Sequence, residues 1–419
     1  MRFLLLAFTV WTAAAADTGQ SGMATERLAR IPASMKGFVE RGTIAGSVTL
    51  VARHGKVAAI DAVGSQDIEA KKPMSPDTIF RIASMTKPFT GVGIMMLVED
   101  GRLSLWDPVE KYLPEFRDMW LVESREGDAR LILKRPARAM RIHDLMTHTS
   151  GLTDGPAHAG DPSLVVTPTL PHGVFYGMVW YGGFPNFQPR TLAEAVLAIS
   201  RQPLEFDPGT KWTYSSTGIT ILGRIIEVVS GQPYEQFLEQ RIFGPLGMTD
   251  TSFFPGAAKT GRLAAAYALE NGKLVRASET ERQRQAPAYP NPAGGLYSTA
   301  MDLAAFYQMM LNGGTYKGVR ILSKASVSAM TSVQTGDLEV SGPTHGSAYG
   351  LTWELIRGPL DGLALNSPGT FGHAGSLGTQ GWVDPAKDLI GVFLIQRTRN
   401  NGPDEATAFR ALACAAVSD

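Results

Sequence analysis

The sequence predicts an α+β fold, in which both ends of the chain build one antiparallel sheet and the middle forms a helical lobe. Residues 45–53 and 56–63 alternate short and apolar side chains around His54-Gly55, a pattern typical of a β-hairpin. Near the other end, residues 382–383 and 389–396 flank a short turn and predict a second hairpin. Helical spacing prevails between these two regions. Strands at both ends around a helical middle therefore indicate the α+β class.

The first half of the chain supplies a hairpin between two helical segments. Residues 24–41 are predicted to form a helix ahead of the hairpin, and the apolar run 89–98 a second helix that ends near Asp100-Gly101. Residues 103–141 are mixed and broken by prolines, and the charged stretch 123–138 within them is expected to be an exposed excursion.

The second half begins with a segment that is hard to assign. Residues 155–189 are rich in Gly, Pro and aromatic residues, so they form either a lid or pocket wall or a loop that packs on the lobe without a ligand role. Residues 191–200 and 218–230 have helical spacing, and Gly231 closes the second of these helices. The alanine-rich tail around Cys414 is expected to be helical, with the thiol buried as a small apolar group.

Composition excludes several classes of protein. The chain has 419 residues, of which 44% are apolar and 19% charged, an ordinary globular balance. Its 39 basic and 39 acidic residues cancel, so nothing in the charge favours nucleic acid or an anionic membrane as a partner. We expect a small-molecule substrate, and the sequence leaves the oligomeric state open.

The N-terminus has the features of an export signal. Residues 1–16 contain one basic residue, Arg2, then the apolar run 3–11 and three alanines at 14–16, which matches a signal peptide with a small-residue cleavage site. The chain is therefore expected to be periplasmic or secreted. The alternative is that Met23 is the true start and the protein is cytoplasmic. No later apolar run reaches the roughly 20 residues of a membrane helix.

Ser84 and Lys87 are the strongest candidates for catalysis. They are three residues apart and directly precede the apolar helix at 89–98. Positions i and i+3 share a helix face, so the Lys87 amine can lie beside the Ser84 hydroxyl. Pro88 is tolerable only in the first turn of that helix, which places the helix start close to Ser84. Unpaired N–H groups of the first turn would favour an anion there.

The histidines give no sign of a metal site. His148 lies in Thr-His-Thr-Ser-Gly, where hydroxyls and a glycine surround it, so we predict a turn-stabilising role rather than that of a base. No Gly-x-Ser-x-Gly sequence is present, which argues against an α/β-hydrolase. The other histidines outside the motifs show no metal-ligand spacing and stand at positions 54, 143, 158, 172 and 345. We expect neither a metal nor a cofactor.

Three motifs together resemble a known superfamily. Ser84-x-x-Lys87, Tyr214-Ser215-Ser216 and His373-Ala374-Gly375 follow the order and approximate spacing of the motifs in class C β-lactamases and penicillin-binding-protein-like enzymes. The chain is most similar to the family VIII carboxylesterases. Residues 145–152 and 293–299 are also familiar in that superfamily. Three ordered motifs are much more specific than any one of them.

The resemblance implies a domain organisation. After the signal peptide at 1–16, residues 24–419 would form one β-lactamase/transpeptidase-like catalytic domain. Its antiparallel sheet would come from about 24–80 and 290–419, flanked by N- and C-terminal helices. An all-helical lobe at about 84–290 would be inserted between them.

The resemblance also implies the roles of four residues. Ser84 would be the nucleophile, and Lys87 and Tyr214 would activate it. Unperturbed Lys and Tyr titrate near roughly 10, but their proximity would let them share one proton and titrate as a coupled pair. Which of the two is the base stays open. The backbone N–H groups of Ser84 and of Ser376, on the strand of the third motif, would form the oxyanion hole.

Two departures from the family pattern bear on the substrate. The second motif commonly ends in Asn, but here it ends in Ser216. The third commonly begins with Lys in β-lactamases, but here it begins with His373, which is mostly neutral above a pKa of about 6.5. The site should therefore favour neutral esters over β-lactam carboxylates. We expect Ser216, His373, Gly375, Trp180 and Tyr181 to contact the substrate.

The leading hypothesis is an exported serine carboxylesterase that cleaves short-chain acyl esters through a Ser84 acyl-enzyme, with a possible side activity on β-lactams. The enzymatic alternative is a class C-like β-lactamase or a D-alanyl-D-alanine carboxypeptidase. A further alternative is a non-catalytic penicillin-binding-like protein that uses the cleft for recognition.

Overall fold

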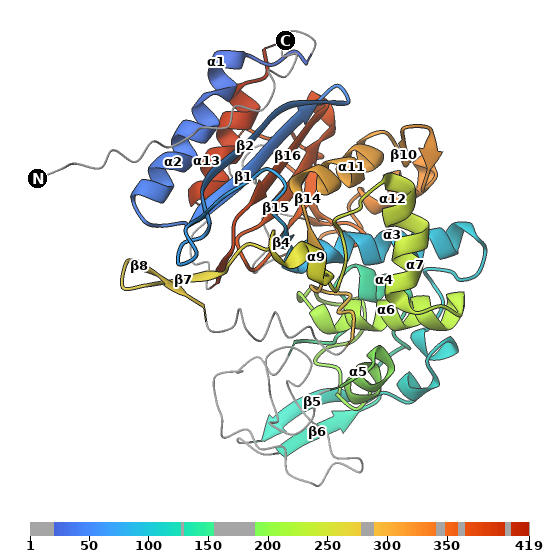
Figure 1. Cartoon of the computed structure of the whole chain (residues 1–419). Helices are drawn as coiled ribbons and strands as arrows, with labels where there is room; N and C mark the ends of the chain where they lie inside the picture. The colour runs from blue at the N-terminus through green and yellow to red at the C-terminus, as the bar shows by residue number, and fades with distance from the viewer. Residues whose placement is uncertain are drawn as a thin grey trace, which may run out of the picture.

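A large antiparallel sheet divides the molecule into layers. The computed structural model describes residues 21–126, 130–154, 189–277, 289–340, 348–358, 365–398 and 404–418. In that part of the chain eight strands form the main sheet, in the order β12-β13-β14-β15-β16-β1-β2-β3 (Figure 1). The strands are β1 (Gly46–Arg53), β2 (Lys56–Asp67), β3 (Lys72–Pro73), β12 (Ala348–Tyr349), β13 (Glu354–Leu355), β14 (Phe371–Ala374), β15 (Gln380–Asp384) and β16 (Leu389–Leu394).

The centre of the sheet joins the two predicted hairpins. β1 pairs antiparallel with β2 on one side and with β16 on the other, and β16 pairs with β15. Every residue of β1 is buried. Val48 and Leu50 point into the larger core, whereas Val51 points into the smaller core on the other face, as the two-residue period of a strand requires. The α+β class and both terminal hairpins are thus confirmed.

Helices from both ends of the chain cover one face. This face packs against α1 (Thr25–Leu28), α2 (Arg30–Glu40) and α13 (Asp404–Ala415), which lie side by side (Figure 1). The single predicted helix at 24–41 is therefore two helices, which meet at Ala29. Cys414 is buried in α13, as predicted, and burial raises the pKa of its thiol to about 12.

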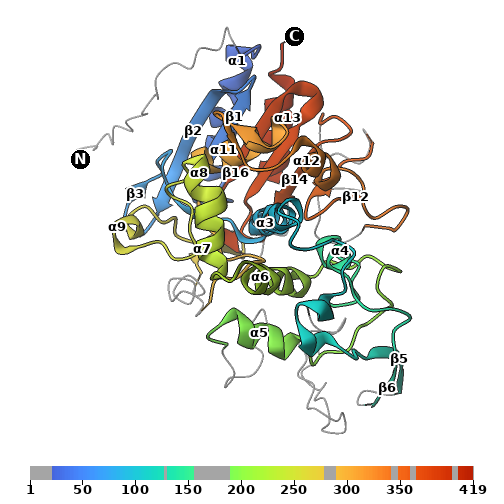
Figure 2. The same cartoon turned by 90° about the vertical axis from the view of Figure 1, so that its right-hand side faces the viewer.

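The other face carries the helical lobe (Figure 2). α11 (Ala300–Leu311) lies directly on β1, β15 and β16, and α3 (Lys87–Glu99) packs against α6 (Ser216–Ser230). The remaining helices of the described residues are α4 (Ile142–Met146), α5 (Leu192–Ile199), α7 (Tyr234–Leu238), α8 (Gly244–Leu246), α9 (Ala257–Thr260) and α12 (Lys324–Met330). Short helical turns lie at Val109–Lys111, Pro114–Phe116 and Glu239–Phe243, and another at Pro385–Lys387 connects β15 to β16.

Four small sheets accompany the main sheet in the described residues. The charged excursion is a hairpin of β5 (Leu121–Glu126) and β6 (Arg130–Lys134), far from the main sheet in Figure 1. The other pairings are β17 (Arg397–Thr398) with β7 (Tyr267–Glu270) and β8 (Lys273–Arg276), β4 (Phe80–Arg81) with β9 (Tyr297–Ser298), and β10 (Thr315–Tyr316) with β11 (Val319–Arg320). The prediction that residues 84–290 are all-helical is wrong, because β5, β6, β7 and β8 lie within this range. The division into one domain with an inserted lobe stays a prediction.

The first described residues are held by the sheet and by the C-terminal helix. Arg53 Nη1 donates to the Gly22 carbonyl at 2.7 Å, and Met23 forms a β-bridge with Val417. Residues 1–16, the predicted signal peptide, lie outside the described residues. No helix in the described part of the chain has the length and apolar character needed to cross a membrane.

Candidate active site

Ser84 lies in a 3₁₀ turn, η2 (Ala83–Thr86), that runs directly into α3. Pro88 occupies the first turn of α3, so the helix begins where the proline predicted. Ala83 has a φ of +47°, a left-handed conformation that side chains rarely adopt. Such backbone strain clusters at active sites, where the surrounding structure enforces it.

Two neighbouring segments hold this turn in place. Thr86 Oγ1 donates to the Ala83 carbonyl at 2.7 Å and accepts from the Leu296 N–H at 3.2 Å. Thr379, in the turn between β14 and β15, donates its hydroxyl to the Ile82 carbonyl at 3.2 Å. A Cβ added to Gly375 would collide with Ile82 O and Thr379 Oγ1, so the third motif needs glycine to approach the turn of Ser84 so closely.

Lys87 is completely buried at the first turn of α3. Its Nζ lies 3.0 Å from Ser84 Oγ, 3.2 Å from Ser216 Oγ and 2.8 Å from the Ala293 carbonyl. Burial lowers the pKa of Lys87 to about 7, although the charges of Asp154 and Glu354 oppose this shift. A neutral amine donates only two protons, here to Ala293 O and Ser216 Oγ, which leaves its lone pair for the Ser84 hydroxyl.

The second motif reaches the same place from the start of α6. Ser215 caps the helix by accepting the Gly218 N–H, which sets Tyr214 just before the helix and Ser216 as its first residue. The Tyr214 ring centroid lies 4.8 Å from Lys87 Nζ. The Ser216 hydroxyl is buried and bound to Lys87.

The third motif lies on β14, where His373 is buried. His373 Nε2 lies 3.2 Å from Tyr349 Oη, and the same oxygen lies 3.0 Å from His148 Nε2. His148 has the predicted turn role, with a φ of +59° and a carbonyl that accepts from the Thr213 N–H. Its ring also packs 4.7 Å from the ring of Tyr214. Burial lowers the pKa of His148 well below its usual value.

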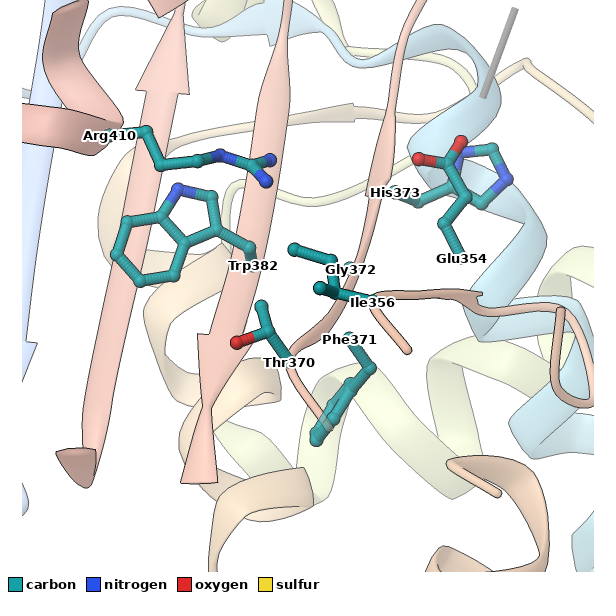
Figure 3. Close-up of a pocket in the computed structure, with 8 residues that line it drawn as sticks. All are labelled: Glu354, Ile356, Thr370, Phe371, Gly372, His373, Trp382 and Arg410. Atoms are coloured by element: carbon teal, nitrogen blue, oxygen red, sulfur yellow. The ribbon is translucent and has the colours of Figure 1, made fainter. Parts of the chain in front are cut away.

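A small pocket lies behind the third motif (Figure 3). His373 and Glu354 lie next to each other at one end of it, with Nδ1 and Oε1 3.5 Å apart. Arg410 lies beside the Trp382 indole at the other end. Burial lowers the pKa of Arg410, and the charge of Glu354 counteracts this shift. Glu354 therefore faces a histidine and a buried guanidinium.

The structure brings six of the predicted site residues together: Ser84, Lys87, Tyr214, Ser216, His373 and Gly375. Ser376 is exposed in the turn after β14, beyond the end of the strand on which it was expected. Trp180 and Tyr181 lie outside the described residues. Within the part of the chain that the structure describes, no group of His, Cys, Asp or Glu side chains is arranged to hold a metal ion.

Sequence reasoning missed three contributors. Ala293 acts through its carbonyl, and only the familiar stretch 293–299 pointed to its neighbourhood. Tyr349 and Glu354 lie on two-residue strands, and no local pattern marked either of them.

Comparison with known proteins identifies the family. The family model described as Beta-lactamase matches residues 31–416. An uncharacterized protein of Mycobacterium tuberculosis is 34% identical over 387 residues, which cover 90% of this chain and 92% of that protein. Esterase EstB of Burkholderia gladioli is 30% identical over 412 residues (93% and 96%). A putative D-alanyl-D-alanine carboxypeptidase of Escherichia coli is 29% identical over 351 residues (79% and 72%).

A solved structure supports the same fold. EstCE1, a hydrolase with promiscuous acyltransferase activity, superposes with a TM-score of 0.75 at 24% identity, covering 94% of this chain and 98% of its own. The resemblance drawn from the three motifs is thus confirmed. The chain belongs to the beta-lactamase family.

Proposed function

We propose that the protein is a serine carboxylesterase that cleaves short-chain acyl esters through an acyl-enzyme on Ser84. The observation that carries this proposal is the buried Lys87 amine, 3.0 Å from Ser84 Oγ and with a pKa of about 7. At neutral pH a large fraction of this amine is uncharged. A serine hydroxyl needs such a base before it can attack.

Acylation begins when the Ser84 hydroxyl attacks the ester carbonyl. Its proton passes to the Lys87–Tyr214 pair, in which the amine and the phenol share one proton. The oxyanion that forms is stabilised by the backbone N–H groups of Ser84 and Ser376, a contribution typically worth ~10²–10³ in rate. The pair then protonates the leaving alkoxide, and the alcohol departs. The acyl group remains as an ester on Ser84.

Deacylation reverses the roles. The Lys87–Tyr214 pair takes a proton from a water molecule, which attacks the acyl carbonyl in the same oxyanion hole. The tetrahedral intermediate collapses, the Ser84 oxygen leaves and recovers the proton, and the carboxylic acid is released. Every proton moves between side chains and water, so the mechanism needs neither a metal nor a cofactor.

Support for an ester as substrate comes from the third motif and from a relative. His373 stands where a permanent lysine charge would meet a β-lactam carboxylate, and a histidine is mostly neutral above a pKa of about 6.5. Esterase EstB is similar over nearly the whole chain. His373, Gly375 and Ser216 would line the acyl site, together with Trp180 and Tyr181.

The runner-up is a β-lactamase or D-alanyl-D-alanine carboxypeptidase, because a putative carboxypeptidase is also a relative. The purified protein should be assayed with p-nitrophenyl esters of increasing acyl length, with nitrocefin and with a D-Ala-D-Ala peptide. Our proposal predicts the highest kcat/KM for a short-chain ester and no turnover by Ser84→Ala. Faster opening of nitrocefin, or faster release of D-Ala, would replace it by the runner-up.

A non-catalytic binding protein is the third possibility. A fluorophosphonate probe reacts with an activated serine but not with an ordinary one. Stoichiometric labelling that disappears in Ser84→Ala would eliminate this alternative, whereas an unlabelled protein would support it.

We also propose that the protein is exported after removal of residues 1–16. The Ser21 and Gly22 carbonyls accept hydrogen bonds from Arg53, so residues upstream of Met23 contribute to the fold. Expression of the full reading frame followed by N-terminal sequencing tests this directly. A mature chain that begins near Asp17 is expected, and one that begins at Met23 would contradict the proposal.

A further inference from the structure

One continuous set of hydrogen bonds connects the second and third motifs, and it starts at a backbone donor. The Ser215 N–H can only donate, and it points at His148 Nδ1 at 3.2 Å. Nδ1 therefore carries no proton. Because burial lowers the pKa of His148 well below its usual value, the ring is neutral and its proton is on Nε2. His148 Nε2–H then donates to Tyr349 Oη at 3.0 Å.

The other end of the set is fixed by a backbone acceptor. The Ala374 carbonyl can only accept, and it lies 2.7 Å from His373 Nδ1. His373 therefore carries a proton on Nδ1. Tyr349 Oη lies between the two imidazoles and already accepts from His148, so its own proton goes to His373 Nε2 at 3.2 Å. Each of the three side chains then donates once and accepts once.

The direction of the hydrogen bond from Tyr349 to His373 determines the charge of His373. A second proton on His373 Nε2 would leave the Tyr349 hydroxyl between two donors, with no acceptor for its proton. Tyr349 is completely buried, so this proton could not turn to solvent instead. Tyr349 cannot escape by ionising either, because burial and the nearby Tyr214 and Glu354 raise its pKa far above the usual value.

Other groups around His373 do not reverse this argument. The acidic group beside His373 in the described residues is the Glu354 carboxylate of β13, whose Oε1 lies 3.5 Å from His373 Nδ1. Its charge also acts on Arg410 of α13 across the pocket in Figure 3, so it has a permanent cation besides the histidine. Among the residues that the structure describes, the other titratable neighbours are Tyr349 of β12, the Tyr214 ring at 6.2 Å and His148, which itself feels the charge of Lys87.

We propose that Tyr349 is a positioning residue that holds His373 as the neutral Nδ1–H tautomer and thereby keeps β14 uncharged where this strand packs against the turn of Ser84. The consequence is a specificity for uncharged acyl esters over substrates that carry a carboxylate beside the scissile bond. This consequence rests on the proposed esterase function. The tautomer of His373 does not, and it can be measured without any substrate.

The first experiment is therefore spectroscopic. Protein labelled with ¹⁵N-histidine is studied by NMR between pH 8 and 6, and the His373 signals are assigned by their loss in His373→Gln. We expect a neutral ring with a protonated Nδ1 and an unprotonated Nε2 across this range. An imidazolium at pH 7, or a proton on Nε2, would overturn the assignment.

The second experiment uses Tyr349→Phe, which keeps the ring and removes the hydroxyl. Tyr234→Phe is the matched control, since Tyr234 is also buried and makes its hydrogen bond to Thr90, away from His373. In Tyr349→Phe, the hydroxyl that donates to His373 Nε2 is gone, so this nitrogen can take a second proton as the pH falls from 8 to 6. The positive ring then attracts a carboxylate.

The readout is the ratio of kcat/KM for nitrocefin to kcat/KM for p-nitrophenyl butyrate. Both substrates react at Ser84, so effects on its activation cancel in the ratio. Between pH 8 and 6 this ratio should stay flat in the wild type and in Tyr234→Phe, and rise about tenfold in Tyr349→Phe, the value of one charge-assisted contact. A flat ratio in Tyr349→Phe would refute the specificity role.

The two experiments separate the possible failures. If the wild type hydrolyses neither substrate, the esterase proposal and the specificity role fail, and the NMR result alone decides the tautomer. If esters are hydrolysed but His373 is charged at pH 7, only the inference about Tyr349 fails.

Discussion

The candidate active site has two buried polar regions of opposite character. Around Lys87, a single amine meets three oxygen atoms: two hydroxyls and the Ala293 carbonyl. Around Tyr349, two imidazoles and a phenol form a closed set of hydrogen bonds between a backbone donor and a backbone acceptor. Both regions are buried, and in the first of them burial lowers the pKa of Lys87 to about 7.

The difference shows what burial does in each place. At Lys87 it removes water from a cation, which lowers the pKa and produces a base. At His148 burial likewise favours the neutral ring, but both of its nitrogens already have partners, so no proton is available for transfer. The first region is thus suited to proton transfer, and the second to holding the His373 ring in one fixed, uncharged form.

The largest effect should come from breaking the lysine region. Ser84→Ala, Lys87→Ala and Tyr214→Phe should each lower kcat for p-nitrophenyl butyrate by about 10³-fold or more, because each removes part of one catalytic unit. The double variants should lose little more than the single ones. Measuring kcat for p-nitrophenyl butyrate in all single and double variants tests this prediction. Losses in kcat that multiply from the single to the double variants would show that the three residues act independently. Near-wild-type turnover in Tyr214→Phe would remove Tyr214 from the unit.

The next largest effect concerns the close approach of Gly375 to the Ile82 carbonyl, beside the turn of Ser84. Gly375→Ala should lower kcat by about 100-fold, because the new methyl group would push the β14–β15 turn away from Ile82 and displace the nucleophile. Gly256→Ala is the control, since a Cβ there meets open space. Equal activity in the two variants, with circular dichroism confirming that both fold, would show that the close approach at Gly375 is not needed.

Changing the charge at position 373 should have a smaller effect. His373→Lys should raise the ratio of nitrocefin to butyrate turnover about tenfold, because a permanent cation would face the β-lactam carboxylate. The effect should be present at every pH from 6 to 8, unlike that of Tyr349→Phe. An unchanged ratio would refute the importance of charge at this position.

The smallest effect is a displacement of the pH profile. With a Lys87 pKa of about 7, kcat/KM should fall about tenfold per pH unit below 7, as the amine becomes protonated, and level off above it. The Asp154 charge raises this pKa, so Asp154→Asn should move the acid limb to lower pH and give about twofold more activity at pH 6. Asp100→Asn, at an exposed ion pair with Arg241, should leave the profile unchanged. A shift to higher pH in Asp154→Asn would contradict this electrostatic account.

The sequence predicted those parts of the fold that depend on local patterns. The hairpin around His54-Gly55 has a two-residue period and a turn with positive φ at both residues. The division of the first helix at Ala29 could not be predicted, because alanine is a good helix former and the break accompanies the packing of α1 against α13. The pairing of β5 with β6 was not predicted, because the many charged residues of this stretch indicated only an exposed excursion.

The site divides in the same way. Ser84, Lys87 and Pro88 are linked by helix geometry, so their arrangement follows from spacing alone. Tyr349 and Glu354 reach His373 only because β12 pairs with β13 and β13 pairs with β14, which no local pattern in the sequence marks. Ala293 contributes a backbone oxygen, which no side-chain pattern can reveal.

In the proposed reaction, Ser84 carries the acyl group during turnover. Acid quenching of the reaction with p-nitrophenyl butyrate, followed by mass spectrometry of the digested protein, tests it directly. We predict the mass increase of one butyryl group on the peptide that contains Ser84, and its absence in Ser84→Ala. A butyryl group on another residue, or undiminished ester hydrolysis by Ser84→Ala, would contradict the claim.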